Sequence, residues 1–420
     1  MCLTWDRGPE FKLSLARRNS NHLRFCNLPP RRDHPLRELT YIGKSKVEWR
    51  SVPEPRLGGP GEALVRPVIA ARCDGDNLPL FNNVTNPMRA GVALHYLDPV
   101  TTDLLGPYPY GKPFAIGHEC IAEVVECGER VRHFRKGQLA IIPWAISCGG
   151  CWNCRDGLTS KCTEAGGTLL SAYGFGDSMG PWGGAVSDLL RVPFADAMLV
   201  PVPATIDPLK LASASDNMPD AWRAVGPALA KQPGAPVLIL GGGARSIGLY
   251  AAGMAVALGA SQVDYLDHNF ERLRIAESLG ARAIETRRGA GWFARRAPRV
   301  HGEFRIAVEA SSTGAGLRYA LRSLSPGGVC TAVGFYFAAR TGLPLMQMYA
   351  NSTTLHVGVS HARADLPHVI RLVERDEFDP LKVATLIADW DDAPDAFTTR
   401  TTKVIVRRKE FDRNAGSITS

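Results

Sequence analysis

The sequence predicts a β-rich unit followed by an α/β unit that is built on a doubly wound parallel sheet. At 420 residues the chain is too long for one compact core and long enough for two domains. Short apolar runs between turn residues dominate residues 38–216, whereas strands alternate with helical patterns over residues 217–359. Residues 360–420 add a helix and a strand that do not extend this alternation.

The β-rich unit is predicted from apolar runs that turn signals interrupt every eight to twelve residues or so. Its expected strands cover residues 39–43, 46–50, 61–71, 121–128, 139–144 and 185–193. This number of short strands at regular spacing favours a distorted barrel.

The α/β unit is predicted from alternating buried strands and helical patterns. Helical periodicity marks residues 208–230, 249–260 and 271–280. Strand patterns mark residues 236–240, 261–267, 304–310, 328–335 and 353–359. Strands that alternate with helices favour a parallel sheet with helices on both faces.

Composition places the body of the chain among ordinary globular enzymes, with 45% hydrophobic and 21% charged residues. No run of 18 apolar residues occurs, so we expect no membrane span. Much of the net charge of +8 falls in residues 1–37, where eight basic and three acidic residues give +5. We interpret this arm as a disordered tail or a misassigned start, with a nucleic-acid-binding arm as the alternative. The remaining chain is not basic enough to indicate nucleic acid binding.

One segment has the spacing of a closed metal site. Four cysteines lie within fifteen residues in a C-x2-C-x2-C-x7-C pattern: Cys148, Cys151, Cys154 and Cys162. Four thiolates this close suit one tetrahedral zinc ion, and a site without an open ligand position is structural. An iron–sulfur cluster and a pair of disulfides are the alternatives.

Three further residues are weak metal candidates singly and stronger together. Cys73 follows a predicted strand, His118 and Glu119 open another, and Asp216 precedes a predicted helix. Taken alone, Cys73 is a packed thiol, His118 a structural histidine and Asp216 a helix cap. Taken together, a thiolate, an imidazole and a carboxylate make an open three-ligand zinc site with room for water or substrate.

The segment GGGARSIG, residues 241–248, joins a buried strand to a small-residue helix, as in a dinucleotide-binding turn. Its glycines Gly241, Gly243 and Gly248 depart from regular G-x-G-x-x-G spacing, because Gly248 lies five residues after Gly243 rather than three. The start of the helix is expected to receive a pyrophosphate. Arg245 is either a phosphate contact or a solvated side chain.

An acidic residue follows at the distance expected for ribose recognition. Asp267 ends the second strand, 19 residues after Gly248, where a carboxylate binds the ribose hydroxyls of NAD and repels a 2′-phosphate. Arg272 either contacts the same ribose or lies on the helix surface. Turn, context and acid together favour NAD over NADP.

With these motifs the chain resembles the zinc-dependent medium-chain alcohol dehydrogenases. The resemblance rests on GHE at residues 117–119, the four-cysteine segment, the VLILGGG turn and the domain order, and it covers about residues 36–408. It implies a co-chaperonin-like β-barrel catalytic domain, an inserted Rossmann domain and a return of residues 360–420 to the catalytic domain. It also implies a homodimer or homotetramer joined through the Rossmann sheets.

The resemblance assigns roles to individual residues. Cys73, His118 and Asp216 match the three catalytic zinc ligands, where many members have Cys in place of Asp and a polyol- or formaldehyde-active branch has Asp. Glu119 matches a carboxylate that can approach the metal. Asp76 matches the carboxylate that orients the ligand histidine.

Two features depart from the family pattern. Gly75 stands where the family has the Ser or Thr that begins the proton relay, and His95, Tyr96 or a water on Asp76 are possible substitutes. The first two ligands are 45 residues apart, with residues 81–111 inserted over the expected mouth of the site. These departures concern the substrate and the proton route, whereas the metal and cofactor motifs are intact.

We therefore expect a cytoplasmic oxidoreductase with two Zn²⁺ ions per subunit that transfers a hydride between NAD and an alcohol, polyol or aldehyde hydrate. Five of the ten cysteines are assigned to metals, and the other five are expected to be free thiols in a reducing compartment. The expected partner is a small-molecule alcohol or aldehyde, with no nucleic acid and no membrane. The alternatives are an aldehyde dismutase with tightly held NAD and a non-catalytic nucleotide-binding relative.

Overall fold

The computed structural model describes residues 35–166, 169–287 and 302–409. The strands of these residues form three β-sheets. Residues 1–34 of the predicted basic arm lie outside the described residues.

The largest sheet of the first unit has the order β15-β16-β3-β5-β6-β8, with β7 paired to β3. Its strands are β3 (Ala63–Ala71), β5 (Glu119–Cys127), β6 (Leu139–Ile142), β7 (Leu190–Val192), β8 (Val200–Pro201), β15 (Leu386–Asp389) and β16 (Val404–Arg407). The strands β15 and β16 join this sheet because β16 pairs antiparallel with β3, with Ile405 opposite Ala71. Residues 386–407 thus return to the β-rich unit.

A second, three-stranded sheet has the order β2-β1-β4. It consists of β1 (Leu36–Gly43), β2 (Lys46–Val52) and β4 (Phe114–Ala115). Its apolar side chains Leu39, Tyr41 and Val47 share one core with the inner faces of β3 and β5.

The segment between Cys73 and His118 forms three short helices: α1 (Asn77–Phe81), α2 (Thr85–Ala93) and α3 (Val100–Leu105). The sequence analysis assigned no structure to this insertion. Met88 and Leu105 anchor it in a separate apolar cluster that also contains Trp144.

The second unit is a six-stranded parallel sheet with the order β11-β10-β9-β12-β13-β14. The strands are β9 (Val237–Leu240), β10 (Val263–Asp267), β11 (Arg282–Glu285), β12 (Phe304–Glu309), β13 (Leu324–Ala332) and β14 (Thr354–Val357). This strand order confirms the predicted doubly wound fold. The sequence analysis missed β11, a four-residue edge strand whose side chains are all at least partly exposed.

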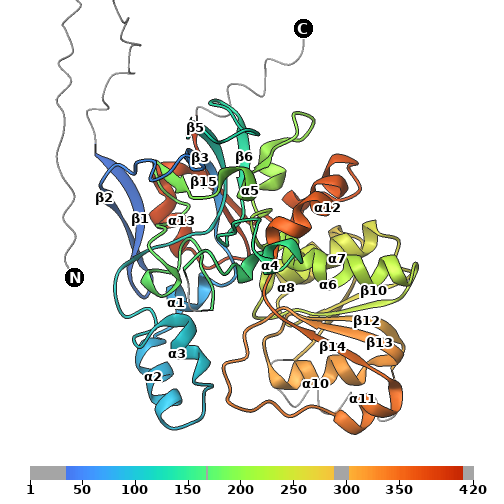
Figure 1. The fold of residues 1–420 in the computed structure, drawn as a ribbon. Helices are drawn as coiled ribbons and strands as arrows, with labels where there is room; N and C mark the ends of the chain where they lie inside the picture. The colour runs from blue at the N-terminus through green and yellow to red at the C-terminus, as the bar shows by residue number, and fades with distance from the viewer. Residues whose placement is uncertain (1–34, 167–168, 288–301, 410–420) are drawn as a thin grey trace, which may run out of the picture. The chain divides into compact units, whose positions relative to one another are not determined.

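Helices cover both faces of this sheet, with α10 and α11 on one face and α6, α7 and α8 on the other (Figure 1). Their bounds, with that of the later α12, are α6 (Asn217–Lys231), α7 (Arg245–Ala257), α8 (Phe270–Ser278), α10 (Gly314–Arg322), α11 (Leu345–Asn351) and α12 (Ala362–Glu374). The helix predicted over residues 208–230 is instead a 3-10 turn, Pro208–Leu211, followed by α6. The break between them leaves Asp216 outside the helix with φ −154°.

Shorter elements complete the described chain. They are α4 (Trp152–Arg155), α5 (Ala195–Met198), α13 (Ala393–Thr398) and the 3-10 turns Thr159–Lys161, Asp177–Met179, Pro380–Val383 and Trp390–Asp392. Among the described residues, no helix combines the length and the apolar character needed to cross a membrane.

Candidate active site

Three chain segments bring Cys73, His118 and Asp216 together. Cys73 lies two residues beyond the end of β3, His118 immediately precedes β5, and Asp216 precedes α6. The Cys73 Sγ lies 3.2 Å from Asp216 Oδ2, which lies 3.5 Å from His118 Nε2. The Asp216 carboxylate accepts no backbone N–H at the start of α6, so the alternative that its side chain caps this helix is wrong. One sulfur, one nitrogen and one oxygen donor thus converge at one point.

The donors of this cluster fit a zinc ion. Both ring nitrogens of His118 are buried without a hydrogen-bond partner, although buried polar atoms are normally paired. Burial, followed by the charge of Asp216, raises the pKa of the Cys73 thiol well above its ordinary value. A cation at this point would supply the missing partner of His118 and would stabilise the thiolate. Thiolate, imidazole and carboxylate are all zinc donors.

Two neighbours hold the donors in place. Asp76 accepts a 3.0 Å hydrogen bond from the Cys73 backbone N–H, and its other oxygen lies 3.6 Å from His118 Nδ1. Asn217, which the sequence analysis did not single out, donates from Nδ2 to Cys73 Sγ over 3.1 Å. The geometry places Asp76 where the orienting carboxylate was predicted, and it adds Asn217 as a donor to the sulfur.

Glu119 points into a buried ion pair. Its carboxylate accepts from Lys403 Nζ and, over 3.0 Å, from the Asn217 backbone N–H. Both charged side chains are fully buried. Desolvation alone would lower the pKa of Lys403, but Glu119 together with Tyr250, Cys73 and Asp74 raises that pKa above its ordinary value. In the sequence, the only sign of Lys403 is a basic residue immediately before the apolar strand β16.

The predicted relay position has no hydroxyl, and an aromatic ring lies over it. A Cβ built on Gly75 would lie 3.7 Å from Phe335 Cε2 and 3.8 Å from Cys73 Sγ. His95 and Tyr96 are exposed residues just after α2 and are not part of the buried cluster.

The imidazole of the cluster lies against aromatic side chains. The Phe175 ring stacks on His118 with centroids 4.6 Å apart, and Trp144 meets Phe175 edge-on at 6.1 Å. Phe335 stacks on Phe337 at 5.6 Å. These aromatic rings add apolar surface beside His118 and Gly75.

The insertion joins the β-rich unit to the loop after β13. Leu97 forms a β-bridge with Ala338, and the Asp98 N–H donates to the Phe337 carbonyl over 2.9 Å. The Ala339 N–H donates to the Tyr96 carbonyl over the same distance. The insertion is therefore fastened to the loop that carries Phe335.

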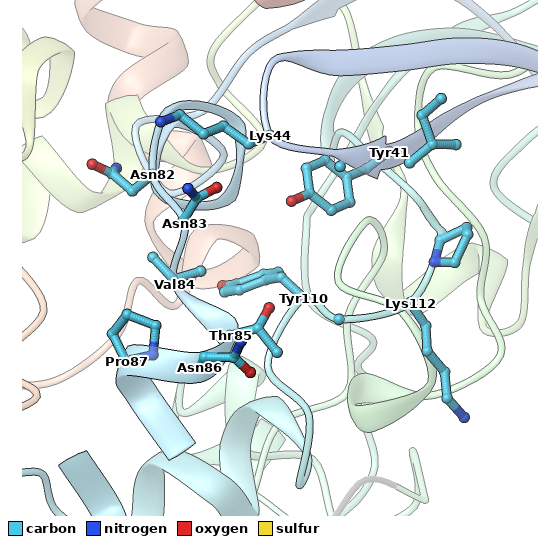
Figure 2. A pocket seen from close by; sticks show the side chains of 14 residues that line it. Tyr41, Lys44, Asn82, Asn83, Val84, Thr85, Asn86, Pro87, Tyr110 and Lys112 are labelled. Atoms are coloured by element: carbon cyan, nitrogen blue, oxygen red, sulfur yellow. The ribbon is translucent and has the colours of Figure 1, made fainter. Parts of the chain in front are cut away.

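A cavity of about 460 Å³ lies between the turn after β1 and the start of the insertion. The rings of Tyr41 and Tyr110 both point toward the Asn82–Pro87 side of this cavity (Figure 2). Burial raises the pKa of Tyr110, and the charges of Asp76 and Cys73 add to the effect. Tyr110 thus lines the cavity and lies close enough to Asp76 and Cys73 for their charges to affect it.

The four cysteines of the second predicted metal site also converge. The Sγ atoms of Cys148, Cys151, Cys154 and Cys162 all lie within 4.8 Å of one another. Backbone N–H groups aim at these sulfurs, among them Cys151 N to Cys148 Sγ at 3.2 Å and Cys148 N to Cys162 Sγ at 3.3 Å. Hydrogen bonds from the Cys154 and Thr163 N–H groups lower the pKa of Cys151 to about 6. Four sulfurs that accept N–H donors suit a closed zinc site.

The glycine turn links β9 to α7 as predicted, with a close approach at its first residue. A Cβ on Gly241 would lie only 2.4 Å from Asp267 Oδ2 and 2.5 Å from the Tyr265 hydroxyl. Gly248 packs α7 against the sheet, where a Cβ would meet Ala310 at 3.3 Å. Gly243 donates its N–H to the Ser311 carbonyl over 3.2 Å.

Asp267 lies at the end of β10, where a ribose-binding acid is expected, but protein donors already surround it. Arg272 donates to both carboxylate oxygens over 2.7 Å each, and the Tyr265 hydroxyl donates over 3.0 Å. Backbone N–H groups of His268 and Asn269 complete the set at 2.7 and 3.0 Å. Arg272 is therefore a buried partner of Asp267, and the alternative that it lies on the helix surface is wrong.

The first turn of α7, where a pyrophosphate is expected, is also engaged. The Asp74 carboxylate accepts from the backbone N–H of Ser246 at 2.8 Å and of Ile247 at 3.1 Å. Arg245 is half-buried and donates to the Thr401 carbonyl over 3.4 Å. As arranged here, these amides do not fit a pyrophosphate until the Asp74 carboxylate leaves them.

Comparisons with known proteins cover most of the described chain. Residues 59–204 match the family of alcohol dehydrogenase GroES-like domains, and residues 246–375 match the zinc-binding dehydrogenase family. A probable zinc-binding alcohol dehydrogenase of Mycobacterium tuberculosis is 27% identical over 364 residues, which span 87% of this chain and 85% of the relative. A glutathione-independent formaldehyde dehydrogenase of Bacillus subtilis is 34% identical over 263 residues, 60% of this chain and 59% of that protein.

A solved structure shares the whole architecture. The alcohol dehydrogenase of Thermus sp. ATN1 matches with a TM-score of 0.71 at 26% sequence identity, and the match covers 89% of this chain and 100% of that one. The GroES-like family match fits the β-rich unit with its predicted co-chaperonin-like fold, and the second match fits the parallel sheet.

Proposed function

Since the chain belongs to the zinc-dependent medium-chain alcohol dehydrogenases, a family of oxidoreductases, we propose that it transfers a hydride between NAD and an alcohol, polyol or aldehyde hydrate. One observation carries the proposal: the buried His118 ring, which has no hydrogen-bond partner, lies with a ring nitrogen within 4.8 Å of the Cys73 sulfur and of an Asp216 carboxylate oxygen. Donor groups in this arrangement suit a catalytic zinc ion with one position left for substrate.

In this proposal each residue around the cluster has a defined task. Cys73, His118 and Asp216 hold the ion, Asp76 orients His118, and Asn217 hydrogen-bonds the sulfur. A zinc ion in this position supplies Lewis-acid polarisation of a substrate oxygen. The aromatic side chains beside His118 exclude water from the reacting atoms. The four-cysteine site holds a second, structural zinc ion, which makes two per chain.

The proposed substrate class includes aldehyde hydrates because of the donor set and one relative. Asp216 gives the site a carboxylate in the third ligand position. The Bacillus subtilis relative with 34% identity is named a formaldehyde dehydrogenase. The apolar rings of Phe175 and Phe335 favour a small or apolar substituent over a highly charged one.

NAD is the proposed cofactor because Asp267 ends β10, the strand next to the glycine turn. The bidentate Arg272 offsets the charge of this carboxylate, which weakens its repulsion of a 2′-phosphate. The cofactor test therefore compares NAD with NADP directly. The dinucleotide supplies the hydride acceptor when it is bound.

A homodimer or homotetramer joined through the parallel sheet is the proposed assembly. The edge strand β14 and helix α11 carry exposed apolar side chains, namely Val357, Leu345, Met346 and Tyr349. An open strand edge flanked by apolar side chains suits pairing with a second copy.

The experiment is a screen of alcohols, polyols and aldehydes for NAD and NADP reduction, with zinc counted per chain in the same preparation. The proposal expects dinucleotide reduction with at least one substrate class and two zinc ions per chain. The Cys73→Ala and His118→Ala variants are expected to lose activity and one zinc while keeping the other. Aldehyde turnover without added dinucleotide would identify a dismutase, and full turnover in either variant would contradict the site assignment.

A further inference from the structure

The carboxylate of Asp74 lies at the start of α7, where Rossmann folds bind the pyrophosphate of a dinucleotide. Its Oδ2 accepts from Ser246 N at 2.8 Å, Ile247 N at 3.1 Å and Ser246 Oγ at 3.0 Å. The free N–H groups and the helix dipole at such a terminus attract anions. Here the anion is a side chain of the protein itself.

A second observation marks Asp74 as more than a helix cap. Its other oxygen, Oδ1, is buried and has no hydrogen-bond partner, although the residue is only 8% exposed. A permanent structural carboxylate normally has both oxygens paired, because an unpaired buried oxygen loses its hydration without compensation.

Several arginines lie near the start of α7, beside the Asp74 carboxylate. Arg245 is the first residue of α7, and burial together with the positive charges of Arg272 and Arg400 lowers its pKa. Arg72 also lies close enough to Arg245 for mutual repulsion, which contributes to the lowered pKa of Arg72. Arg272 is paired with Asp267, whereas the recorded partner of Arg245 is the Thr401 carbonyl at 3.4 Å, so Arg245 is the cation that suits a pyrophosphate here.

We propose that Asp74 is an internal anion that occupies the pyrophosphate position of α7 while no dinucleotide is bound, and that the dinucleotide has to displace it. The inference rests on the proposed function, because it assumes that α7 receives a dinucleotide. Displacement reduces the observed affinity by the fraction of molecules in which Asp74 has left the amides. Because Asp74 follows Cys73 directly, the same movement reaches the loop that holds the catalytic metal.

The test measures dissociation constants of NADH, NADPH, ADP and adenosine by calorimetry on zinc-loaded protein. Asp74→Asn and Asp74→Ala are compared with wild type, and zinc content reports that each variant is folded. Asp207→Asn is the matched control, because Asp207 also caps a helical turn, with its Oδ1 accepting from Leu209 N over 3.0 Å, but that turn is Pro208–Leu211 rather than α7. We expect ADP and NADH to bind about tenfold tighter or better to both Asp74 variants. Adenosine, which lacks the pyrophosphate, and the control variant are expected to show no change.

The outcomes separate the inference from the function that it rests on. Unchanged or weaker ADP and NADH binding in both Asp74 variants, with wild-type binding intact, would overturn the inference and leave the proposed function standing. A gain for adenosine equal to that for ADP would also overturn it, since the pyrophosphate would then have no part in the effect. The absence of NADH and NADPH binding in every variant and in wild type would overturn both.

Discussion

Replacing Lys403 with methionine removes a cation that is fully buried behind the candidate metal site. Its ammonium donates to the Glu119 carboxylate, to Asn217 Oδ1 at 2.7 Å and to the Arg72 carbonyl at 3.0 Å. Asn217 in turn donates to the Cys73 sulfur. The change therefore affects both the stability of the fold and the support of the metal ligands.

The expected cost follows from what the substitution leaves behind. In Lys403→Met, the Glu119 carboxylate stays fully buried with only the Asn217 N–H as a recorded donor. Breaking a buried ion pair by removing one partner costs about 3–5 kcal/mol, whereas replacing both partners with neutral groups is often close to neutral. In the double variant Lys403→Met/Glu119→Gln, the amide carbonyl of the new side chain still accepts from Asn217 N. We expect the double variant to lose less than about half of the single-variant cost.

Urea unfolding of the zinc-loaded proteins, followed by tryptophan fluorescence, measures these costs from midpoint shifts at a common slope. Zinc content is measured on the same samples, and the Lys403→Met variant is expected to hold its catalytic zinc more weakly. A cost below about 1 kcal/mol for Lys403→Met would show that the buried Glu119 carboxylate does not depend on Lys403. So would a double variant whose cost equals the sum of the two single costs, because the two charges would then not interact.

Three further predictions concern the second metal site, the relay position and pH. Cys151→Ser is expected to lose one zinc per chain and to lower the Tm by more than about 5 °C while the Cys73 cluster keeps its zinc, as metal analysis and calorimetry would show. Gly75→Ser is expected to keep wild-type stability, since a Cβ there meets nothing closer than 3.7 Å. It is also expected to raise the steady-state rate of alcohol oxidation about tenfold by restoring a relay hydroxyl, and an unchanged rate would contradict this. Burial raises the pKa of Asp365 to about 6, so the folded state binds a proton that the unfolded state releases, and stability falls as the pH rises from about 4 to 6. Asp365→Asn is therefore expected to be more stable than wild type by about 1–2 kcal/mol at pH 8 and nearly as stable as wild type at pH 4. Equal stability of the two proteins at pH 8 in urea unfolding would argue against a buried charge at Asp365.

Local patterns were sufficient to predict much of the fold. The alternation of apolar strands and helices after residue 217 predicted the parallel sheet, because buried parallel strands read as continuous apolar runs. The edge strand β11 was missed because its four residues are partly exposed and carry no such run. The insertion was missed because α1 and α3 are only five and six residues long and show no usable period.

Whether a site residue could be predicted depended on how far it lies in the sequence from its partners in the site. The four-cysteine segment was readable because all its ligands lie within one short stretch. Asn217 and Lys403 are polar residues beside apolar runs, and only the pairing of β16 with β3 brings Lys403 near Glu119. Asp74 lies next to a predicted ligand, but its contact with α7 joins residues 172 positions apart. Single-sequence patterns do not encode contacts at that separation.

The proposed reaction depends on the assignment of Cys73, His118 and Asp216 as the ligands of its zinc ion. The most direct test of this assignment is zinc per chain, measured together with dinucleotide reduction, in wild type and Asp216→Ala, with Asp207→Asn as the charge-matched control. We expect two zinc ions and activity in wild type and control, against one zinc ion and at least about a hundredfold lower kcat/KM in Asp216→Ala. Two zinc ions and full turnover in Asp216→Ala would contradict this assignment.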